Sequence, residues 1–388
     1  MENDLLIKNI GKIVSGVFDD PIVVGDAIFV RDGIIKKVGF IDDLPLCNVA
    51  IDVRGATVCP GLIDSHVHPV IGDYTPRQKV VDFIASSVHG GVTRMISAGE
   101  VHMPGRPTGA VGTKALAIVG SKSWDSYRPG GMKMHGGGLL LQEGLQKQDF
   151  LEMYHEGVLH LGEVGLGGYH DWEHIAMMVE WAKQIGMVVM MHIGGVSIPG
   201  SDAITSKHAL MVRPDIASHL NGGPTAPSIA DIEEIIVKTK CALEIIQCGN
   251  VAIIPDIIRI AKESDALNRI IIGTDMPSGT GVIPLGMLRT ISWISGFCGI
   301  APELAIAMAT GNTADVYKIS AGKILEGLEA DLVIMDSPIG SSADDALDAL
   351  RIGDTPGIAG VIIDGKLTVE KSRNTPPARR HLEVINYE

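Results

Sequence analysis

A chain of 388 residues exceeds one small domain, and its 46% hydrophobic content allows a substantial buried core. The formal net charge of −14 argues against nucleic acid or an anionic membrane as partner, although it leaves a small anionic substrate open. No apolar run approaches the roughly 18 residues of a membrane span. Acidic residues near the start, where a secretory signal would be basic, predict a cytoplasmic protein. The five cysteines lack Cys-x-x-Cys spacing and are expected to be reduced, structural residues.

The two ends of the chain share a β-rich pattern. Residues 1–56 alternate apolar and polar positions, and Asp32-Gly33 separates two strand-like runs as in a tight hairpin. Residues 321–388 repeat this style, with Asp364-Gly365 at the turn. We therefore expect one small β-sandwich domain assembled from both termini.

The middle of the chain, residues 57–320, alternates short apolar runs with longer amphipathic segments. Continuous apolar runs are typical of parallel strands covered by helices, and eight strand–helix units of this total length predict a (β/α)₈ TIM barrel. A doubly wound sheet is the alternative. The eight runs lie at 57–66, 92–97, 115–120, 158–163, 187–192, 215–219, 241–246 and 269–275.

Helical patterns lie between these runs. Thr75-Pro76 is typical of a helix cap and first turn, and Gly90-Gly91 of its end. Residues 171–185 carry apolar positions at helical spacing. An α/β architecture follows.

Metal-binding side chains end several of the predicted strands. The first run ends in Asp64-Ser65-His66-Val67-His68, and two histidines at i and i+2 of a strand point to the same face. Other runs end in a carboxylate or an imidazole, and strand ends meet at the mouth of a barrel, where active sites of this fold lie. These further residues are Glu163, His192, His219 and Asp275.

Each of these residues alone has an ordinary explanation. A His-x-His pair occurs in loops, Glu163 or Asp275 would serve as a helix cap, and a single histidine at a strand end is usually just hydrogen-bonded. Their recurrence at the ends of predicted strands 1, 4, 5, 6 and 8 favours a metal site instead. The other histidines do not fit this pattern, except that His135, in a glycine-rich segment, is a candidate for the mouth.

Three motifs resemble the amidohydrolase superfamily, in particular its hydantoinase- and dihydroorotase-like members. They are PGLIDSHVH at 60–68, ATGNTAD at 309–315 and GKILEGLEADLVIMD at 322–336. The resemblance covers nearly the whole chain. It implies a binuclear metal centre in which His66, His68 and Asp275 bind the more buried ion and His192 and His219 the more exposed one.

The bridging position departs from a common pattern of that superfamily. Many members carry a carboxylated lysine at the end of strand 4, where this chain has Glu163. Lys147 and Lys183 lie in predicted helices and are unsuitable substitutes. The resemblance therefore implies a glutamate bridge between two divalent ions, zinc, iron or both, with Asp275 as catalytic acid and base.

Within the superfamily the chain resembles the enzymes that open a cyclic enamide in anaerobic nicotinate fermentation. That resemblance implies hydrolysis of 6-oxo-1,4,5,6-tetrahydronicotinate to 2-formylglutarate and ammonia, and a homotetramer. An anionic substrate needs a cationic anchor. Candidate substrate-binding residues, expected in loops after strands 2 and 3, are Arg106, Tyr127, Arg128, Lys133 and His135.

Two alternatives stay open at this point. One is another cyclic amidohydrolase of the same fold, of the dihydroorotase, hydantoinase or deaminase type. The other is a non-catalytic barrel scaffold, which the filled ligand positions disfavour.

Overall fold

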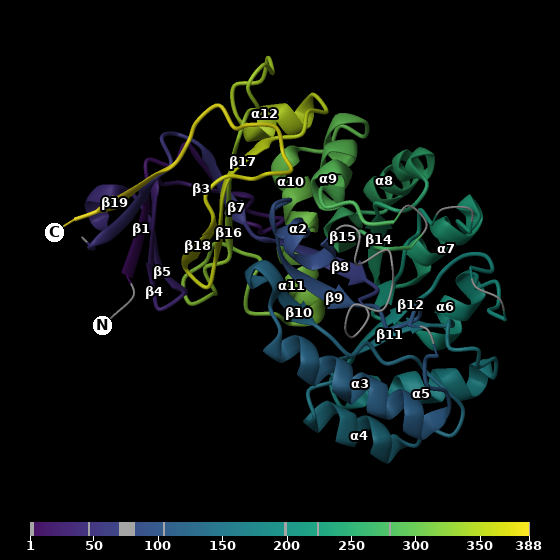
Figure 1. Ribbon diagram of the computed structural model, residues 1–388. Helices are drawn as coiled ribbons and strands as arrows, with labels where there is room; N and C mark the ends of the chain where they lie inside the picture. Colours follow the sequence, from purple (N-terminus) through teal and green to yellow (C-terminus); the bar gives the residue numbers. More distant parts are fainter. Residues whose placement is uncertain are drawn as a thin grey trace.

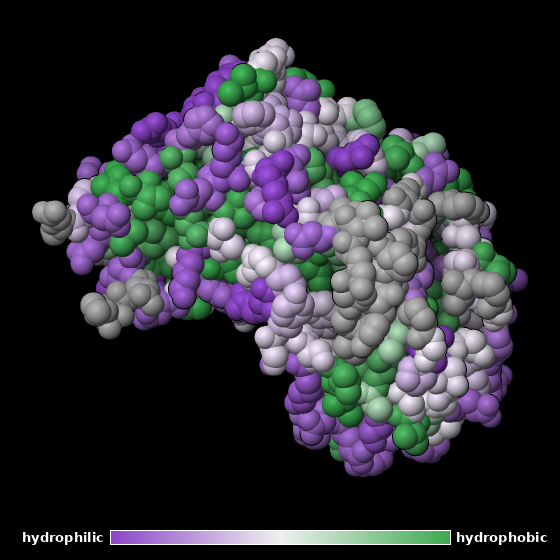
Figure 2. Space-filling model, in the orientation of Figure 1, coloured by the Kyte–Doolittle hydropathy of each residue, from purple (hydrophilic) through white to green (hydrophobic). Residues whose placement is uncertain are grey.

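The computed structural model describes residues 4–45, 47–69, 82–103, 105–197, 200–222, 225–278 and 281–387. Figure 1 shows two parts: a β-rich part, which holds both ends of the chain, and a larger part in which helices surround strands. In the space-filling view, hydrophilic side chains gather near the notch between the two parts (Figure 2). None of the helices in the described ranges has the length and hydrophobicity needed to cross a bilayer.

The β-rich part consists of two sheets built from both ends of the chain. Apolar residues of both sheets, among them Ile7, Ile28, Val58 and Ile334, form one buried cluster. The first sheet has the order β19 (Glu383–Asn386), β6 (Val49–Asp52), β1 (Asp4–Lys8), β4 (Ala27–Arg31), β5 (Ile34–Gly39). The second has the order β18 (Lys366–Val369), β17 (Gly357–Ile363), β16 (Leu332–Asp336), β7 (Thr57–Pro60), β2 (Lys12–Val14), β3 (Ile22–Val23).

Both predicted hairpins are confirmed. Asp32-Gly33 joins β4 to β5, and Asp364-Gly365 joins β17 to β18. All four residues have positive φ, at 51° and 77° in the first turn and 52° and 70° in the second. Two successive positive φ values define a type I′ turn, whose twist matches that of the paired strands. Asp-Gly predicts this turn because it is among the residue pairs that favour positive φ at both positions.

Eight parallel strands form the centre of the larger part. They are β8 (Leu62–Val67), β9 (Val92–Ser97), β10 (Lys133–His135), β11 (His160–Val164), β12 (Val188–Met191), β13 (Ile216–Ala217), β14 (Ala242–Ile246) and β15 (Ile270–Gly273). They pair as β8-β9-β10 and as β11 to β15 in sequence order. Parallel bridges join Leu139 to Leu161 and Val67 to Met276, so both edges of the two sheets are in contact.

Helices connect these strands and cover them. Their bounds are α2 (Phe83–Val88), α3 (Gly109–Ser126), α4 (Lys147–His155), α5 (Trp172–Gln184), α6 (Ser206–Val212), α7 (Ile229–Lys238), α8 (Ile254–Glu263), α9 (Gly286–Gly296), α10 (Pro302–Met308), α11 (Gly311–Tyr317) and α12 (Ala346–Arg351), with 3₁₀ turns η1 (Ile41–Asp43), η2 (Pro129–Gly131), η3 (Val251–Ile253) and η4 (Leu267–Arg269). The helix predicted at 171–185 is confirmed as α5, capped by the Asp171 carboxylate. The predicted cap Thr75-Pro76 lies outside the described residues; α2 ends before Gly90-Gly91 as expected.

The predicted third strand was wrong. Residues 115–120 lie inside α3, whose buried residues Thr113, Ala117, Gly120 and Trp124 recur at helical spacing. The third strand is β10, a short segment of which only Met134 is fully buried. A six-residue apolar run does not separate a strand from a helix by itself, and β10 carries almost no hydrophobic signal.

The cysteines form no disulfide. Cys59 and Cys241 are buried, whereas Cys47, Cys248 and Cys298 are half-buried.

Candidate metal centre

The six predicted ligands come together at the carboxyl ends of the parallel strands. His66 lies in β8 and His68 directly after it, and Glu163 lies in β11. His192 directly follows β12, and His219 and Asp275 come two residues after β13 and β15. All except Asp275 are at least 95% buried. Because parallel strands end on the same side, residues remote in the sequence converge here.

The first cluster contains His66, His68 and Asp275. The two Nε2 atoms are 3.1 Å apart. Asp275 Oδ1 lies 3.4 Å from Nε2 of His66 and 3.1 Å from Nε2 of His68. Asp275 adopts a left-handed backbone, with φ of 57°, and its N–H donates to the His66 carbonyl, which fixes the carboxylate beside β8.

The second cluster contains Glu163, His192 and His219. Glu163 Oε1 lies 3.3 Å from Nδ1 of His192 and 2.6 Å from Nε2 of His219. Its other oxygen, Oε2, lies 3.6 Å from Nε2 of His66 and 3.3 Å from Nε2 of His68. One carboxylate therefore faces both clusters, one oxygen to each.

Hydrogen bonds at the far side of three rings fix which nitrogen faces the clusters. His66 Nδ1 lies 2.9 Å from Glu244 Oε2, and His68 Nδ1 lies 3.0 Å from the Gly99 carbonyl oxygen. His192 Nε2 lies 3.1 Å from the Gly195 carbonyl oxygen. Each of these nitrogens carries the proton and donates it, so the other ring nitrogen presents a lone pair to the cluster.

This donor set fits divalent cations. Lone pairs of two imidazoles face each other and face two carboxylates at 3.1–3.6 Å, an arrangement that is repulsive unless a positive charge lies between them. Asp275 Oδ1 is buried without a hydrogen-bond partner in the described part of the chain. Imidazole and carboxylate together suit zinc or ferrous iron.

The pKa values of these groups reflect the same crowding. Burial opposes protonation of His68, yet the hydrogen bonds that protonated His68 would donate to Asp275 and Glu163 outweigh it and raise its pKa to about 9. Burial would raise the pKa of Asp275, but the neighbouring His66 and His68 lower it to about 2. Positive charge is therefore strongly favoured within the cluster, and a metal ion would supply it.

A cavity of about 380 Å³ opens over both clusters. Its walls include ligands of both clusters, and its rim includes apolar and hydroxyl side chains. The lining residues outside the clusters are Val101, His102, Leu166, Val196, Ser197, Gly222, Thr225, Ile246, Cys248 and Ser278. The volume suits a small-molecule substrate.

A model of the amidohydrolase family matches residues 57–368. This chain belongs to the amidohydrolase family.

Known proteins similar to this amidohydrolase differ widely in sequence identity and in how much of their length the match covers. Enamidase from Eubacterium barkeri is 52% identical over 382 residues, covering 98% of this chain and 99% of the enamidase. A crystal structure of enamidase superposes with a TM-score of 0.95 at 51% identity, covering 99% of this chain and all of the other. Adenine deaminase 2 of Desulfotalea psychrophila is 26% identical, and the match spans 98% of this chain but 60% of the deaminase. The enamidase structure also places the amidohydrolase among TIM-barrel-type α/β folds.

Glu244 was missed by the sequence interpretation. It lies in β14 and is fully buried. It accepts hydrogen bonds from Ser65 Oγ at 2.6 Å and Ser218 Oγ at 2.7 Å, besides that from His66. Burial opposes ionisation, but His66 and these donors hold its pKa below the usual value. A glutamate in the middle of the apolar run CALEII was the signal that could have revealed it.

None of the five predicted substrate-binding residues is among the described residues that line the cavity. Because residues 115–120 form a helix, Tyr127 and Arg128 precede the third strand and lie at its amino end, opposite the mouth. Arg128 pairs with Asp364 at 2.7 Å, and Lys133 pairs with Asp331 at 2.9 Å and Asp364 at 2.5 Å, all from the β-rich part. His135 ends β10, but its ring contacts Arg94 at 3.3 Å.

Of these five residues, only Arg106 lies in the loop where it was expected. It follows β9 in the same loop as Val101 and His102, which line the cavity. Its Nη1 atom is buried without a hydrogen-bond partner in the described residues, and burial lowers the pKa of the guanidinium.

Proposed function

We propose that this amidohydrolase is an enamidase-type enzyme, which hydrolyses 6-oxo-1,4,5,6-tetrahydronicotinate to 2-formylglutarate and ammonia. The choice of substrate rests on the 52% identity with enamidase, which extends over nearly all of both chains. The donor set of the candidate metal centre supports the chemistry independently, because metal-assisted hydrolysis of an amide needs such a set at the base of a cavity.

The reaction consumes two waters. The first adds hydroxyl to the ring carbonyl carbon and a proton to the ring nitrogen as the amide C–N bond breaks. The enamine so released tautomerises to an imine, and the second water converts the imine to an aldehyde and ammonia. Only the first stage needs strong activation from the protein.

His66, His68 and Asp275 would hold one divalent ion, zinc or iron, His192 and His219 would hold the other, and Glu163 would bridge them. When bound, such ions polarise the carbonyl and lower the pKa of water towards about 7. Asp275 would accept the proton of the attacking water and deliver it to the departing ring nitrogen. Burial opposes ionisation of Asp275, but His66 and His68 lower its pKa, so this side chain is a carboxylate at neutral pH.

Arg106 is proposed as the anchor for the substrate carboxylate. A guanidinium with a buried, unpartnered nitrogen in the described residues pays a desolvation cost that a carboxylate ligand would offset. It lies in a loop whose Val101 and His102 already line the cavity, which supports this role.

A turnover assay with the cyclic enamide tests the proposal. The wild-type enzyme should release ammonia, Asp275→Asn should lose roughly 10²–10⁴-fold in kcat while keeping bound metal, and Arg106→Gln should raise KM with little change in kcat. Absence of turnover by metal-loaded wild-type enzyme, with activity on dihydroorotate, a hydantoin or adenine instead, would reject this substrate. Near-normal kcat of Asp275→Asn would reject the proton role.

The finer architecture is part of the same proposal. We infer a closed (β/α)₈ barrel over residues 57–320 and a β-sandwich domain composed of residues 1–56 and 321–388. The bridges at both sheet edges and the shared apolar cluster support two such domains, but β7 (Thr57–Pro60) pairs within the second sheet, which moves the first boundary past Pro60. A cytoplasmic homotetramer is proposed from the resemblance, and light scattering of the purified enzyme tests the tetramer.

A further inference from the structure

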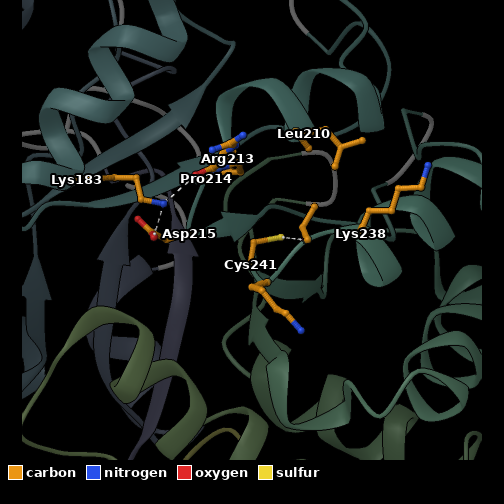
Figure 3. Close-up of a pocket in the computed structure, with 10 residues that line it drawn as sticks. Lys183, Leu210, Arg213, Pro214, Asp215, Lys238 and Cys241 are labelled. Atoms are coloured by element: carbon orange, nitrogen blue, oxygen red, sulfur yellow. Dashed lines mark hydrogen bonds and ion pairs between the residues drawn. The ribbon is translucent and has the colours of Figure 1, made fainter.

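A second cavity, of about 530 Å³, lies far from the metal centre, at the amino ends of β13 and β14. Its lining residues come from α5, from α6 and the turn that follows it, and from the end of α7 and the segment after it (Figure 3). Its apolar side is formed by Ala209, Leu210 and Pro214, and four of its lining side chains are cationic. These are Lys183, Arg213, Lys238 and Lys240, against the single carboxylate of Asp215. Such a concentration of positive charge is notable in a chain with a net charge of −14.

Internal pairing accounts for only part of this charge. Asp215 is committed to Lys183, whose Nζ lies 2.9 Å from Oδ1, and to the Val189 N–H, at 2.9 Å from Oδ2. Figure 3 shows Lys183 pointing to this carboxylate. Lys238 pairs with Glu234 at 2.6 Å. The structure gives no hydrogen bond or ion pair to the side chains of Arg213 and Lys240 within the described residues, so these two solvent-exposed cations line the cavity without a protein partner there.

Arg213 also has an unusual backbone. It closes α6 in the left-handed conformation, with φ of 54° and ψ of 58°. Glycine or asparagine normally occupies such a position, and a following proline, here Pro214, disfavours it further. A left-handed conformation is unfavourable for an ordinary residue, because its Cβ approaches the following carbonyl oxygen. Glycine would avoid this cost, so the arginine side chain at the cavity needs a reason other than helix termination.

An adjoining cavity of about 320 Å³ extends the cationic region. It shares Lys183, Asp215 and Lys240 with the first cavity and adds Lys318. Val188 and Ala242 form part of its wall. Cationic and apolar side chains together line the two cavities. Such a lining suits a small organic anion better than a metal ion or an apolar ligand.

We propose that this cavity is a second ligand site, which binds a small dianion, either a dicarboxylate or a phosphate, through Arg213 and Lys240. Arg213 would contribute planar, paired donors and Lys240 a point charge. The site is separate from catalysis, because it lies at the amino end of β13, whereas His219 of the metal centre follows the carboxyl end of that strand.

Isothermal titration calorimetry of the full-length, metal-loaded enzyme at low ionic strength tests this site, with glutarate and inorganic phosphate as separate probes. Wild type should bind at least one of them saturably, and the probe bound more tightly identifies the source. Arg213→Gly should weaken that binding at least tenfold while melting no lower than wild type, because glycine adopts the left-handed conformation freely. Lys240→Gln should weaken it similarly.

Lys207→Gln is the matched control, since Lys207 is an exposed cation on α6 outside the cavity lining. It should change affinity less than twofold. The proposal is overturned if wild type binds neither probe saturably, if binding survives both Arg213→Gly and Lys240→Gln, or if the control weakens binding as much as they do.

Discussion

At the scale of single residues, the candidate metal centre depends on how buried imidazoles are oriented. A ring that donates one N–H to a fixed acceptor must present its other nitrogen in one direction, and such outer partners tune metal affinity. His66 has the most elaborate support, because Glu244 holds its Nδ1 and is itself held by two serine hydroxyls. The His219 N–H also donates to Glu244, at 3.1 Å, so one buried carboxylate braces ligands of both clusters.

Replacing Glu244 with glutamine should therefore weaken the metal centre. The amide keeps the size of the side chain, but it has one acceptor oxygen for four donors and no charge to hold the His66 N–H. We expect about 10–100-fold weaker metal binding or activity. Competition with a chelator measures it, with the exposed Glu263→Gln on α8 as control. Unchanged metal affinity in Glu244→Gln would show that Glu244 does not orient His66.

The residues of the site divided clearly into those that the sequence predicts and those that it does not. His66, His68, Glu163, His192, His219 and Asp275 were predictable because each stands at the end of an apolar run, and the structure brings all six together. Glu244 was missed because it lies inside such a run. Every residue of β14 is buried, and a buried position inside a strand normally indicates packing rather than function. The distinction is positional: strand ends signal function, whereas strand interiors signal packing.

At the scale of elements, one misassignment displaced three predicted substrate-binding residues, Tyr127, Arg128 and Lys133, to the amino end of the third strand. Taking 115–120 as a strand put residues 127–135 in a loop at the mouth, whereas α3 brings the chain back to the amino ends of the strands before β10 begins. Arg128 and Lys133 consequently pair with residues of the β-rich part. A strand of three residues with one buried side chain leaves too little pattern to be recognised.

β15 and β8 lie in close contact, and this contact sets the position of Asp275 relative to His66 and His68. A Cβ on Gly273 would lie 2.7 Å from Ser65 Oγ and 2.9 Å from His66 Cβ, so a side chain there would force the strands apart. Gly273→Ala should destabilise the fold by about 1–3 kcal/mol, the usual range for overpacking, and should weaken metal binding. Gly39→Ala is the control, because a Cβ there meets nothing within 4 Å. Denaturant unfolding gives both values, and equal stability of the two variants would contradict this close approach.

At the scale of the whole molecule, ion pairs connect the β-rich part to the strands of the larger part. Arg94 of β9 and Lys133 of β10 reach Asp331, which directly precedes β16. Asp331 is almost completely buried, and its carboxylate lies 3.0 Å from Arg94 Nη2. Two sheets from the chain ends are thereby attached to the amino ends of the parallel strands, away from the metal centre.

Acid should destabilise the molecule through a buried histidine. His160, at the start of β11, donates to the Ser97 carbonyl at 2.7 Å, and burial lowers its pKa to about 4. In the unfolded chain its pKa is about 6.5. Between these values the unfolded chain binds a proton that the folded protein does not, so stability falls as the pH drops from about 6.5 to about 4, by about 3 kcal/mol for this group.

His160→Gln should reduce that loss, because glutamine retains a donor and does not titrate. Unfolding free energies at pH 7 and pH 4.5 give the comparison, with the exposed His155→Gln on α4 as control. A pH dependence that is the same in wild type and His160→Gln would assign the acid sensitivity to other groups.

The central claim is that six side chains hold two divalent ions on either side of one glutamate. A crystal structure of the purified enzyme, with anomalous scattering recorded at the zinc and iron edges, tests this directly. We predict two anomalous peaks, one among His66, His68 and Asp275 and one between His192 and His219, each in contact with a different oxygen of Glu163. Peaks located elsewhere, or a centre without metal in active enzyme, would contradict it.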